Sequence, residues 1–181
     1  MSDLHSRFPH LFNTTYREPI QMQFELWQSP PQDDLISNVN LVPYIGDKWL
    51  IIQVDHIYWE LPGGTREPNE PHAETLKREL LEEAGVRLKS ITALGAWHCH
   101  STAAQPYRPH LPHPDFYRYV SYGEVEIVGK PLNPSDAEQV TLVETVSLQE
   151  AIRRYKSIGR DDFAELYELT AFIRDQKIKA V

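Results

Sequence analysis

The chain has 181 residues, 41% of them hydrophobic and 24% charged, and its formal net charge is −8. This length and composition are ordinary for a globular protein, and we expect residues 1–181 to form a single domain. The negative charge argues against general binding to nucleic-acid polymers or to anionic membranes, because both need basic surfaces.

Cysteine content and apolar patterning bear on the compartment. Cys99 is the only cysteine, which excludes an intrachain disulfide and favours a reducing compartment. The N-terminal residues lack the apolar core of a signal peptide, and no apolar run approaches membrane-spanning length. We therefore expect a cytoplasmic protein.

Residues 1–18 are polar with scattered aromatic side chains, and we expect them to form an N-terminal arm. Such an arm packs either on the domain or on a second subunit, and the second case would give a homodimer. The next segment, 19–27, alternates apolar and polar residues, which predicts a strand with one buried face. Its apolar positions are Ile20, Met22, Phe24 and Leu26.

Two apolar, β-branched runs, 39–45 and 48–54, are joined by Gly46 and Asp47. This junction predicts a tight hairpin. Further along, Trp59–Gly64 has the pattern of a short strand that breaks into a glycine turn. Glycines there allow positive φ angles and a close approach of the backbone to a ligand.

Residues 71–84 have the pattern of a helix. Pro71 suits a first helical position and Gly85 supplies a stop. The apolar residues at helical spacing are Ala73, Leu76, Leu80 and Ala84. Three glutamates at i, i+3 and i+4 place their carboxylates together on another face of the same helix. These are Glu79, Glu82 and Glu83.

The three carboxylates repel one another and destabilise an isolated helix. We expect Arg78 to point to a different side, so that no basic side chain stands among them. A hard divalent cation relieves the repulsion, because such ions prefer oxygen ligands. Mg²⁺ fills the rest of its shell with water and substrate phosphates. The helix alone therefore suggests a metal-assisted enzyme that acts on phosphates.

A strand is expected within 86–97, followed by a long loop, His98–Pro114, which holds four of the eight histidines and four of the fourteen prolines. A loop of this length in a compact domain is usually functional or disordered. Its His-x-His and His-x-x-His spacings leave a transition-metal site open, although histidines and Arg108 facing an anionic substrate fit the loop better. We expect it to form one wall of the substrate pocket.

Strands and helices alternate in the remainder of the chain. Asp115–Val128 predicts two strands or one bent strand, and Gln139–Ser147 predicts the last strand. Ser147 with Glu150 three residues later is a capping-box pattern, which predicts a helix start. A final amphipathic helix is expected over 161–176. Strands flanking two or more helices predict an α/β or α+β sandwich.

The stretch Gly64–Val86 resembles the Nudix box, Gly-x5-Glu-x7-Arg-Glu-U-x-Glu-Glu-x-Gly-U, in which U is aliphatic. Every fixed position is filled, by Gly64, Glu70, Arg78, Glu79, Leu80, Glu82, Glu83, Gly85 and Val86. The motif is highly specific, and the flanking order of strands and helices is also similar to the family. On these residues the chain resembles a Nudix (MutT-like) hydrolase.

The resemblance implies a fold and a reaction. The fold would be an α/β/α sandwich around a central mixed sheet. The reaction would be hydrolysis of a nucleoside diphosphate linked to another moiety, with Mg²⁺ or Mn²⁺ as cofactor. We expect a small-molecule nucleoside triphosphate as substrate, while a nucleotide sugar such as ADP-ribose stays open. The rivals are a nucleotide-sensing domain without turnover and an isoprenoid diphosphate isomerase, which only Cys99 supports.

The resemblance also implies roles for particular residues. The carbonyl of Gly63 would bind the metal, and Glu70 would pair with Arg78 to hold the loop of the box to its helix. Glu79 is our candidate catalytic base, with a glutamate from a later loop as the alternative. The expected metal ligands are Gly63, Glu79, Glu82, Glu83 and a fourth acid, Glu138, with Glu144 and Glu126 as alternatives.

Substrate-binding residues are expected outside the box. An arginine holds a phosphate with two parallel hydrogen bonds, and Arg108 is the candidate. Aromatic side chains stack on a base, and the candidates are Trp97, Tyr107 and Phe116.

Overall fold

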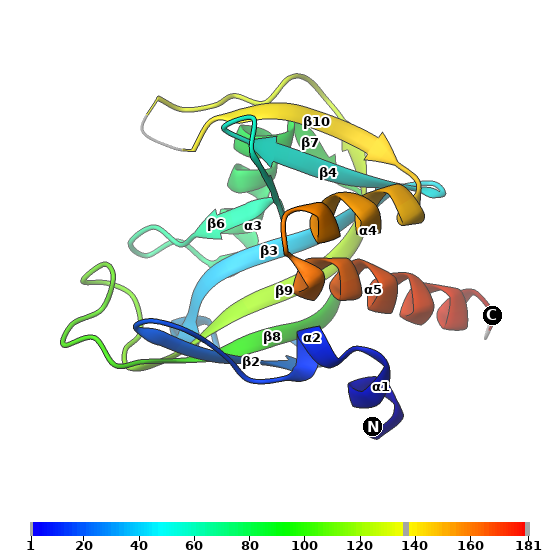
Figure 1. The fold of residues 1–181 in the computed structure, drawn as a ribbon. Coiled ribbons are helices and arrows are strands. Elements are labelled where there is room, and N and C mark those ends of the chain that lie inside the picture. The colour runs from blue at the N-terminus through cyan, green and yellow to red at the C-terminus, as the bar shows by residue number, and fades with distance from the viewer. Residues whose placement is uncertain (1, 136–137, 180–181) are drawn as a thin grey trace.

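A curved mixed sheet is the frame of the molecule, of which the computed structural model describes residues 2–135 and 138–179 (Figure 1). The strands are β1 Thr15–Arg17, β2 Ile20–Leu26, β3 Ile36–Ile45, β4 Lys48–Val54, β5 Tyr58–Glu60, β6 Gly63–Thr65, β7 Val86–Leu88, β8 Thr92–Ser101, β9 Asp115–Ile127 and β10 Val140–Val146. They pair in the order β1-β2-β8-β9-β3-β4-β10, while β5 pairs with β4, β6 with β3 and β7 with β9. The β3–β9 pair is parallel and the other described pairs are antiparallel.

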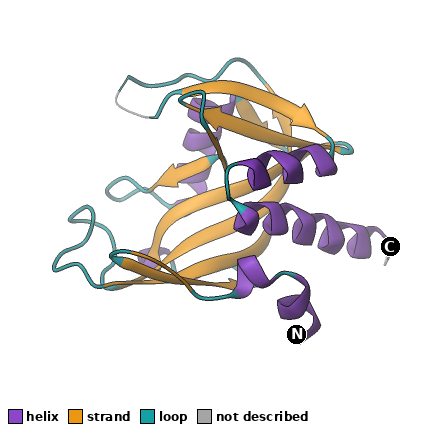
Figure 2. Ribbon diagram, viewed as in Figure 1, coloured by secondary structure: helices purple, strands orange, loops and turns teal. Residues whose placement is uncertain are grey.

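Helices cover both faces of this sheet, as Figure 2 shows. They are α1 Ser2–Arg7, α2 Pro9–Phe12, α3 His72–Glu79, α4 Leu148–Ser157 and α5 Asp161–Lys179, with the shorter helical segments η1 Asp33–Leu35 and η2 Leu80–Ala84. Helices α2, α4 and α5 pack into one hydrophobic core, and α3 with η2 packs into a second. The predicted α/β/α sandwich with a central mixed sheet is confirmed. Among the described residues, no helix is long and apolar enough to span a membrane.

The two cores follow from the alternation of side chains along the strands. On β3, Leu41 enters the core under α3, while Val42 enters the core under α4 and α5. On β4, Leu50 and Ile51 divide in the same way. Strands buried on both faces read as continuous apolar runs, and this explains why 39–45 and 48–54 lack a polar face.

The predicted hairpin at Gly46 and Asp47 is present, but its strands separate after two residue pairs. Beyond that point β6 pairs with β3, opposite Asn38, Val39 and Asn40, and β5 pairs with the far end of β4. The sheet therefore opens between β3 and β4, and the backbone that precedes α3 enters this opening.

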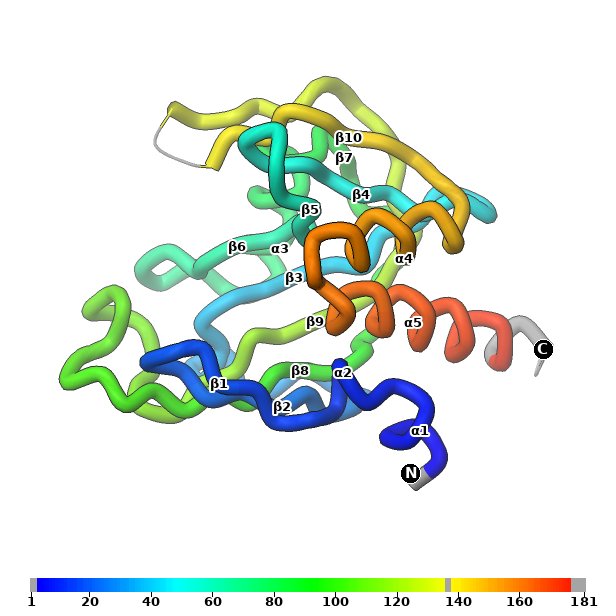
Figure 3. The backbone as a smooth tube through the Cα atoms, viewed as in Figure 1, coloured from blue at the N-terminus to red at the C-terminus, as the bar shows by residue number. Residues whose placement is uncertain are grey.

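The N-terminal arm packs on the domain through two short helices that the sequence analysis did not predict. Phe8, Leu11 and Phe12 are buried beside α5, and Figure 3 shows α2 lying next to that helix. The amide of Leu11 donates to the carboxylate of Glu165 at 2.8 Å, and the ring of His10 contacts the same carboxylate at 2.6 Å.

The boundary of the long loop differs from the sequence prediction, because His98–Ser101 belongs to β8 and the loop spans only 102–114. Of the two alternatives for 115–128, the structure has one long strand, Asp115–Ile127. The helix of the box ends in a wider, π-type turn, and Gly85, with a φ of 62°, stops it as predicted. The predicted cap of α4 is confirmed, since the Ser147 side chain accepts from the amide of Glu150.

We predict that Phe8→Ala lowers the free energy of unfolding by about 3–5 kcal/mol, because it leaves a cavity at a side chain that is 0% exposed. Tyr16→Ala is the matched control. Its ring, on the same arm, is 58% exposed, and its loss should change stability by less than about 0.5 kcal/mol. Urea unfolding measures both. Equal, small effects would mean that the arm does not dock.

Candidate active site

A polar cavity of about 720 Å³ opens where β3 and β4 separate, next to β6 and α3. Its acidic lining residues are Glu60, Glu67, Glu79, Glu82, Glu83 and Glu138, and its basic ones are Arg17, Arg78, Arg108, Arg118 and Arg160. The predicted acids of the box and the predicted fourth acid thus share one cavity. Glu126 does not line it and pairs instead with Arg87, and Glu144 contacts Arg154.

Two glycines bring the backbone against the helix of the box. Gly63 has a φ of 141°, and a Cβ atom there would lie 2.1 Å from the carbonyl oxygen of Val39. A Cβ atom on Gly64 would lie 2.3 Å from a carboxylate oxygen of Glu79. Any side chain at either position would therefore disturb the strand or displace the carboxylate, because such distances are far below van der Waals contact.

Arg78 stands at the centre of the acidic residues. Its guanidinium donates to both carboxylate oxygens of Glu70, at 2.9 and 3.0 Å, which confirms the predicted contact between loop and helix. It also donates to Glu79 at 2.9 Å and to Glu82 at 3.1 Å. The prediction that Arg78 points away from the acidic trio is therefore wrong. Glu82 lies one helical turn further on, within reach of the long arginine side chain.

Glu83 has a different partner. Its Oε2 atom accepts from the amide of Gly63 at 2.8 Å, which links the glycine turn to the helix. Burial raises the pKa of Glu83 to about 8, although this hydrogen bond opposes the shift. Burial also raises the pKa of Glu79, against the neighbouring Arg78 charge. Two buried carboxylates thus lack enough positive charge, and a cation would supply it.

These donors suit a hard divalent ion in chemistry, since they are carboxylate oxygens on one cavity wall beside the Gly63 backbone. In the part of the chain that the structure describes, no three His, Cys, Asp or Glu side chains are grouped closely enough to hold a metal. The reason is visible in the contacts, since Glu79 and Glu82 face Arg78 while Glu83 faces Gly63. Metal binding therefore requires these side chains to turn from their present partners toward one point.

Arg66 fixes the loop of the box and was missed by sequence reasoning. It donates to the carbonyl oxygens of Glu70, at 2.7 and 2.9 Å, and of Ile36, at 3.1 Å. Arg160, which was also missed, donates to Glu60 at 3.3 Å on the opposite side of the cavity. Nothing in the spacing of these arginines marks their contacts at the site, because Glu60 is distant in sequence from Arg160 and these contacts of Arg66 are to backbone atoms.

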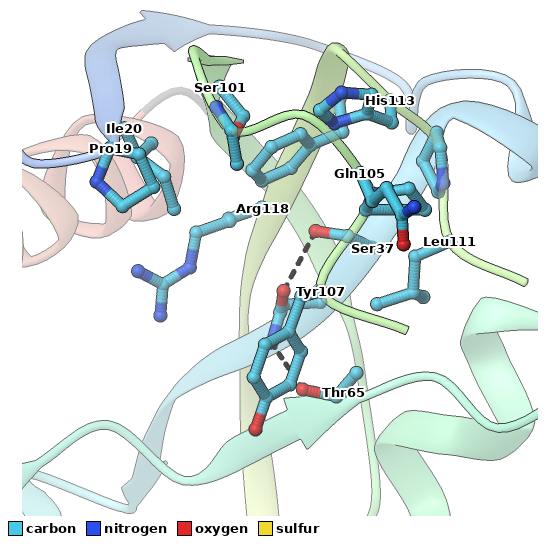
Figure 4. Close-up of a pocket in the computed structure, with 15 residues that line it drawn as sticks. Pro19, Ile20, Ser37, Thr65, Ser101, Gln105, Tyr107, Leu111, His113 and Arg118 are labelled. Carbon is cyan, nitrogen blue, oxygen red and sulfur yellow. Dashed lines mark hydrogen bonds between the residues drawn. The ribbon is translucent and has the colours of Figure 1, made fainter. Parts of the chain in front are cut away.

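A second cavity, of about 430 Å³, adjoins the first and has a mainly apolar lining (Figure 4). Both cavities are lined by Asn38, Thr65, Tyr107 and Arg118. The Asn38 side chain is held in place, since its amide donates to Thr65 at 2.9 Å and its oxygen accepts from Ser37 at 2.7 Å. A flat apolar group fits the second cavity beside a charged group in the first.

The predicted substrate-binding residues divide into two groups. Tyr107 lines both cavities, Arg108 lines the polar cavity and Phe116 lines the apolar one. Trp97, by contrast, is 6% exposed and packs against Phe24 in the core. The prediction that Trp97 stacks on a base is therefore wrong, because its place in β8 turns it toward α5 rather than toward either cavity.

The histidines do not gather at one point within the described residues. His98 and His100 lie on β8, where His98 stacks on Tyr117 and His100 contacts Asp115 at 2.8 Å. His110 contacts the carbonyl of Arg66, and His113 lines the apolar cavity.

Comparison with known proteins agrees with this geometry. The sequence model of the NUDIX domain family matches residues 38–167, which is more than half of the chain. The chain therefore belongs to the Nudix family, a family of hydrolases that act on phosphorus-containing anhydrides and generally use divalent metal ions.

Individual relatives are more distant. A Bacillus subtilis (strain 168) protein, provisionally named 8-oxo-dGTP diphosphatase YtkD, is 34% identical over 86 residues, 48% of this chain and 52% of that protein. The chain thus spans about half the length of this curated relative. Two solved structures share the fold. A mutant of the B. subtilis pyrophosphohydrolase BsRppH has 21% identity and a TM-score of 0.55 over 74% of this chain and 77% of its own. A NUDIX hydrolase from Nitrosomonas europaea has 19% identity and a TM-score of 0.56, over 76% and 89%.

We predict that the contribution of Glu70 to the free energy of unfolding depends on pH and is largest where its carboxylate is ionised. The hydrogen bonds from Arg78 lower the pKa of Glu70 to about 2. A carboxylate whose pKa is lower in the folded state than in the unfolded state stabilises the fold at pH values above its unfolded-state pKa. This stabilisation is lost as the pH falls through its folded-state pKa. The stability gap between wild type and Glu70→Gln should therefore be widest near about pH 6 and shrink toward about pH 3. Urea midpoints across this range measure it, with the exposed Glu67→Gln as control. A gap that does not change with pH would contradict the assignment.

Proposed function

We propose that this protein is a divalent-metal-dependent pyrophosphohydrolase that cleaves nucleoside triphosphates. The observation that carries the proposal is a pair of carboxylates, the buried Glu79 and the half-buried Glu83, on the wall of a polar cavity that adjoins an apolar one. The first cavity has charges for a metal and phosphates, and the second has room for a nucleoside.

A divalent ion, Mg²⁺ or Mn²⁺, would neutralise phosphate charge and lower the pKa of a bound water. Glu79, Glu82, Glu83 and the Gly63 carbonyl are the groups that would hold it, with Glu138, which lines the same cavity, as the fourth acid. The other tasks fall to the chain itself. Arg78 anchors the loop through Glu70 and holds the helix carboxylates in position. Glu79 is our candidate for the base that takes the proton of the attacking water, because burial raises its pKa and so increases the proton affinity of its carboxylate.

The substrate class follows from the joined cavities and from the relative. A base and sugar in the apolar cavity leave the phosphates in the polar one, with Tyr107 and Phe116 placed to contact the base. The provisional name of the B. subtilis relative mentions 8-oxo-dGTP. We therefore propose a nucleoside triphosphate, and 8-oxo-dGTP is the first to test.

We predict that Glu82→Gln and Glu83→Gln each lower kcat/KM by about 100-fold or more while the fold survives, because each removes a charge from the metal site. Phosphate and pyrophosphate release should be measured on a panel of nucleoside triphosphates with Mg²⁺ and with Mn²⁺. Glu126→Gln is the matched control, since Glu126 pairs with Arg87 outside the cavity. If Glu83→Gln keeps a near-wild-type rate at saturating metal and an unchanged melting temperature, the metal assignment fails.

A further inference from the structure

Arg118 is a half-buried cation that has no hydrogen-bond or ion-pair partner among the described residues. It lies on β9, and its buried Nε–H group donates to no acceptor in the described part of the chain. Within residues 2–135 and 138–179, no hydrogen bond or ion pair reaches its guanidinium. Figure 4 shows the side chain extending from the strand between Pro19 and Ile20 on one side and Tyr107 on the other.

The surroundings of Arg118 make this charge costly. Burial lowers its pKa, and the positive charges of Arg160 and Arg17 lower it further. The nearby carboxylate of Glu60 already pairs with Arg160. An unpaired charge away from water destabilises the folded state. A charged side chain that lines a cavity and has no ion-pair partner in the free protein is a candidate for binding a ligand of opposite charge.

The position of Arg118 identifies the part of the ligand that it would meet. Its side chain lines both the apolar and the polar cavity. The helix carboxylates line the polar cavity only, where they are held by Arg78 and Gly63. A nucleotide that spans the two cavities has its first phosphate where they join.

We propose that Arg118 binds the phosphate group adjacent to the nucleoside and so sets which phosphate reaches the acidic residues of the box. The proposal rests on the proposed function, since it assumes a nucleotide ligand. A planar guanidinium holds two phosphate oxygens at once. Arg17, which lines the same cavity and is exposed, adds positive charge for an anion at this junction.

A phosphate explains the site better than the edge of a base does. The polar groups that border the apolar cavity, Ser37, Asn38 and Gln105, are neutral and suit a base. The charges of Arg160 and Arg17 act on Arg118. Glu60, the carboxylate that acts on it, is paired with Arg160. An anionic ligand therefore suits this position better than a neutral one. Arg118 is thus a specificity-determining residue for the phosphate chain.

The test is a binding experiment without divalent metal, so that it does not depend on turnover. Affinities of the four common nucleoside monophosphates and their nucleosides are measured by calorimetry for wild type, Arg118→Met and Arg153→Met. Arg153 is an exposed arginine paired with Glu150, remote from both cavities, and serves as matched control. We expect the wild type to bind its preferred monophosphate at least about 10-fold more tightly than the nucleoside.

Arg118→Met should lose this preference and keep the affinity for the nucleoside, while Arg153→Met should keep both. The proposal is overturned if the wild type shows no preference for the monophosphate, or if Arg118→Met weakens nucleoside and monophosphate equally. Arg118→Lys, which keeps the charge and loses the two-pronged geometry, should retain part of the preference. Retention of the full preference in both Arg118 variants would also overturn it.

Thermal unfolding separates a binding role from a structural one. Without ligand, Arg118→Met should melt at the same temperature as the wild type or higher, because it removes a half-buried charge that no described carboxylate pairs with. A lower melting temperature would show that Arg118 supports the fold and would overturn the proposal. If the monophosphate preference is found but no nucleoside triphosphate is hydrolysed, the proposed function fails while the role of Arg118 stands.

Discussion

The site depends on how Arg78 shares its charge among carboxylates that repel one another. One guanidinium joins Glu70 from the loop with Glu79 and Glu82 from the helix, and the two-pronged bond to Glu70 is the strong form of an arginine–carboxylate pair. This cation lets the acids lie together before any metal binds. A divalent ion would then compete with Arg78 for Glu79 and Glu82 but not for Glu70, so that the loop stays fixed while the helix carboxylates turn. In this account Glu70 belongs to the rigid part of the box, while Glu79 and Glu82 are the residues whose side chains move.

The charged residues line a cavity that lies where the sheet opens between β3 and β4. Because β3 and β4 separate after two residue pairs, the turn at Gly63 and Gly64 inserts between them and reaches the helix. Glu83 then becomes buried against the amide of Gly63, where its charge lacks compensation. The polar cavity adjoins the apolar one at Asn38, Thr65, Tyr107 and Arg118. The position of the polar cavity thus depends on one departure from regular strand pairing.

The sequence predicted most of the frame and the acidic centre, because both rest on local patterns. Apolar runs located β3 and β4, and the spacing of the box located the glutamates, the glycines and the contact between Glu70 and Arg78. Long-range packing was beyond such patterns. The arm helices form because Phe8 and its neighbours dock on α5, and Trp97 is buried because β8 turns it toward that helix. Arg118 stands out because its Nε–H group has no hydrogen-bond acceptor among the described residues, and no sequence motif predicts a missing partner. The orientation of Arg78 was mistaken because side-chain length was left out of the helical reasoning.

Diffraction from crystals grown with Mn²⁺ would test the central claim most directly, because the anomalous signal of manganese locates the ion without assumptions about activity. The account predicts one strong peak within bonding distance of carboxylate oxygens of Glu79, Glu82 and Glu83 and of the Gly63 carbonyl, with Arg78 still bound to Glu70. A peak at the histidines of β8, or no peak in this cavity at millimolar Mn²⁺, would contradict it.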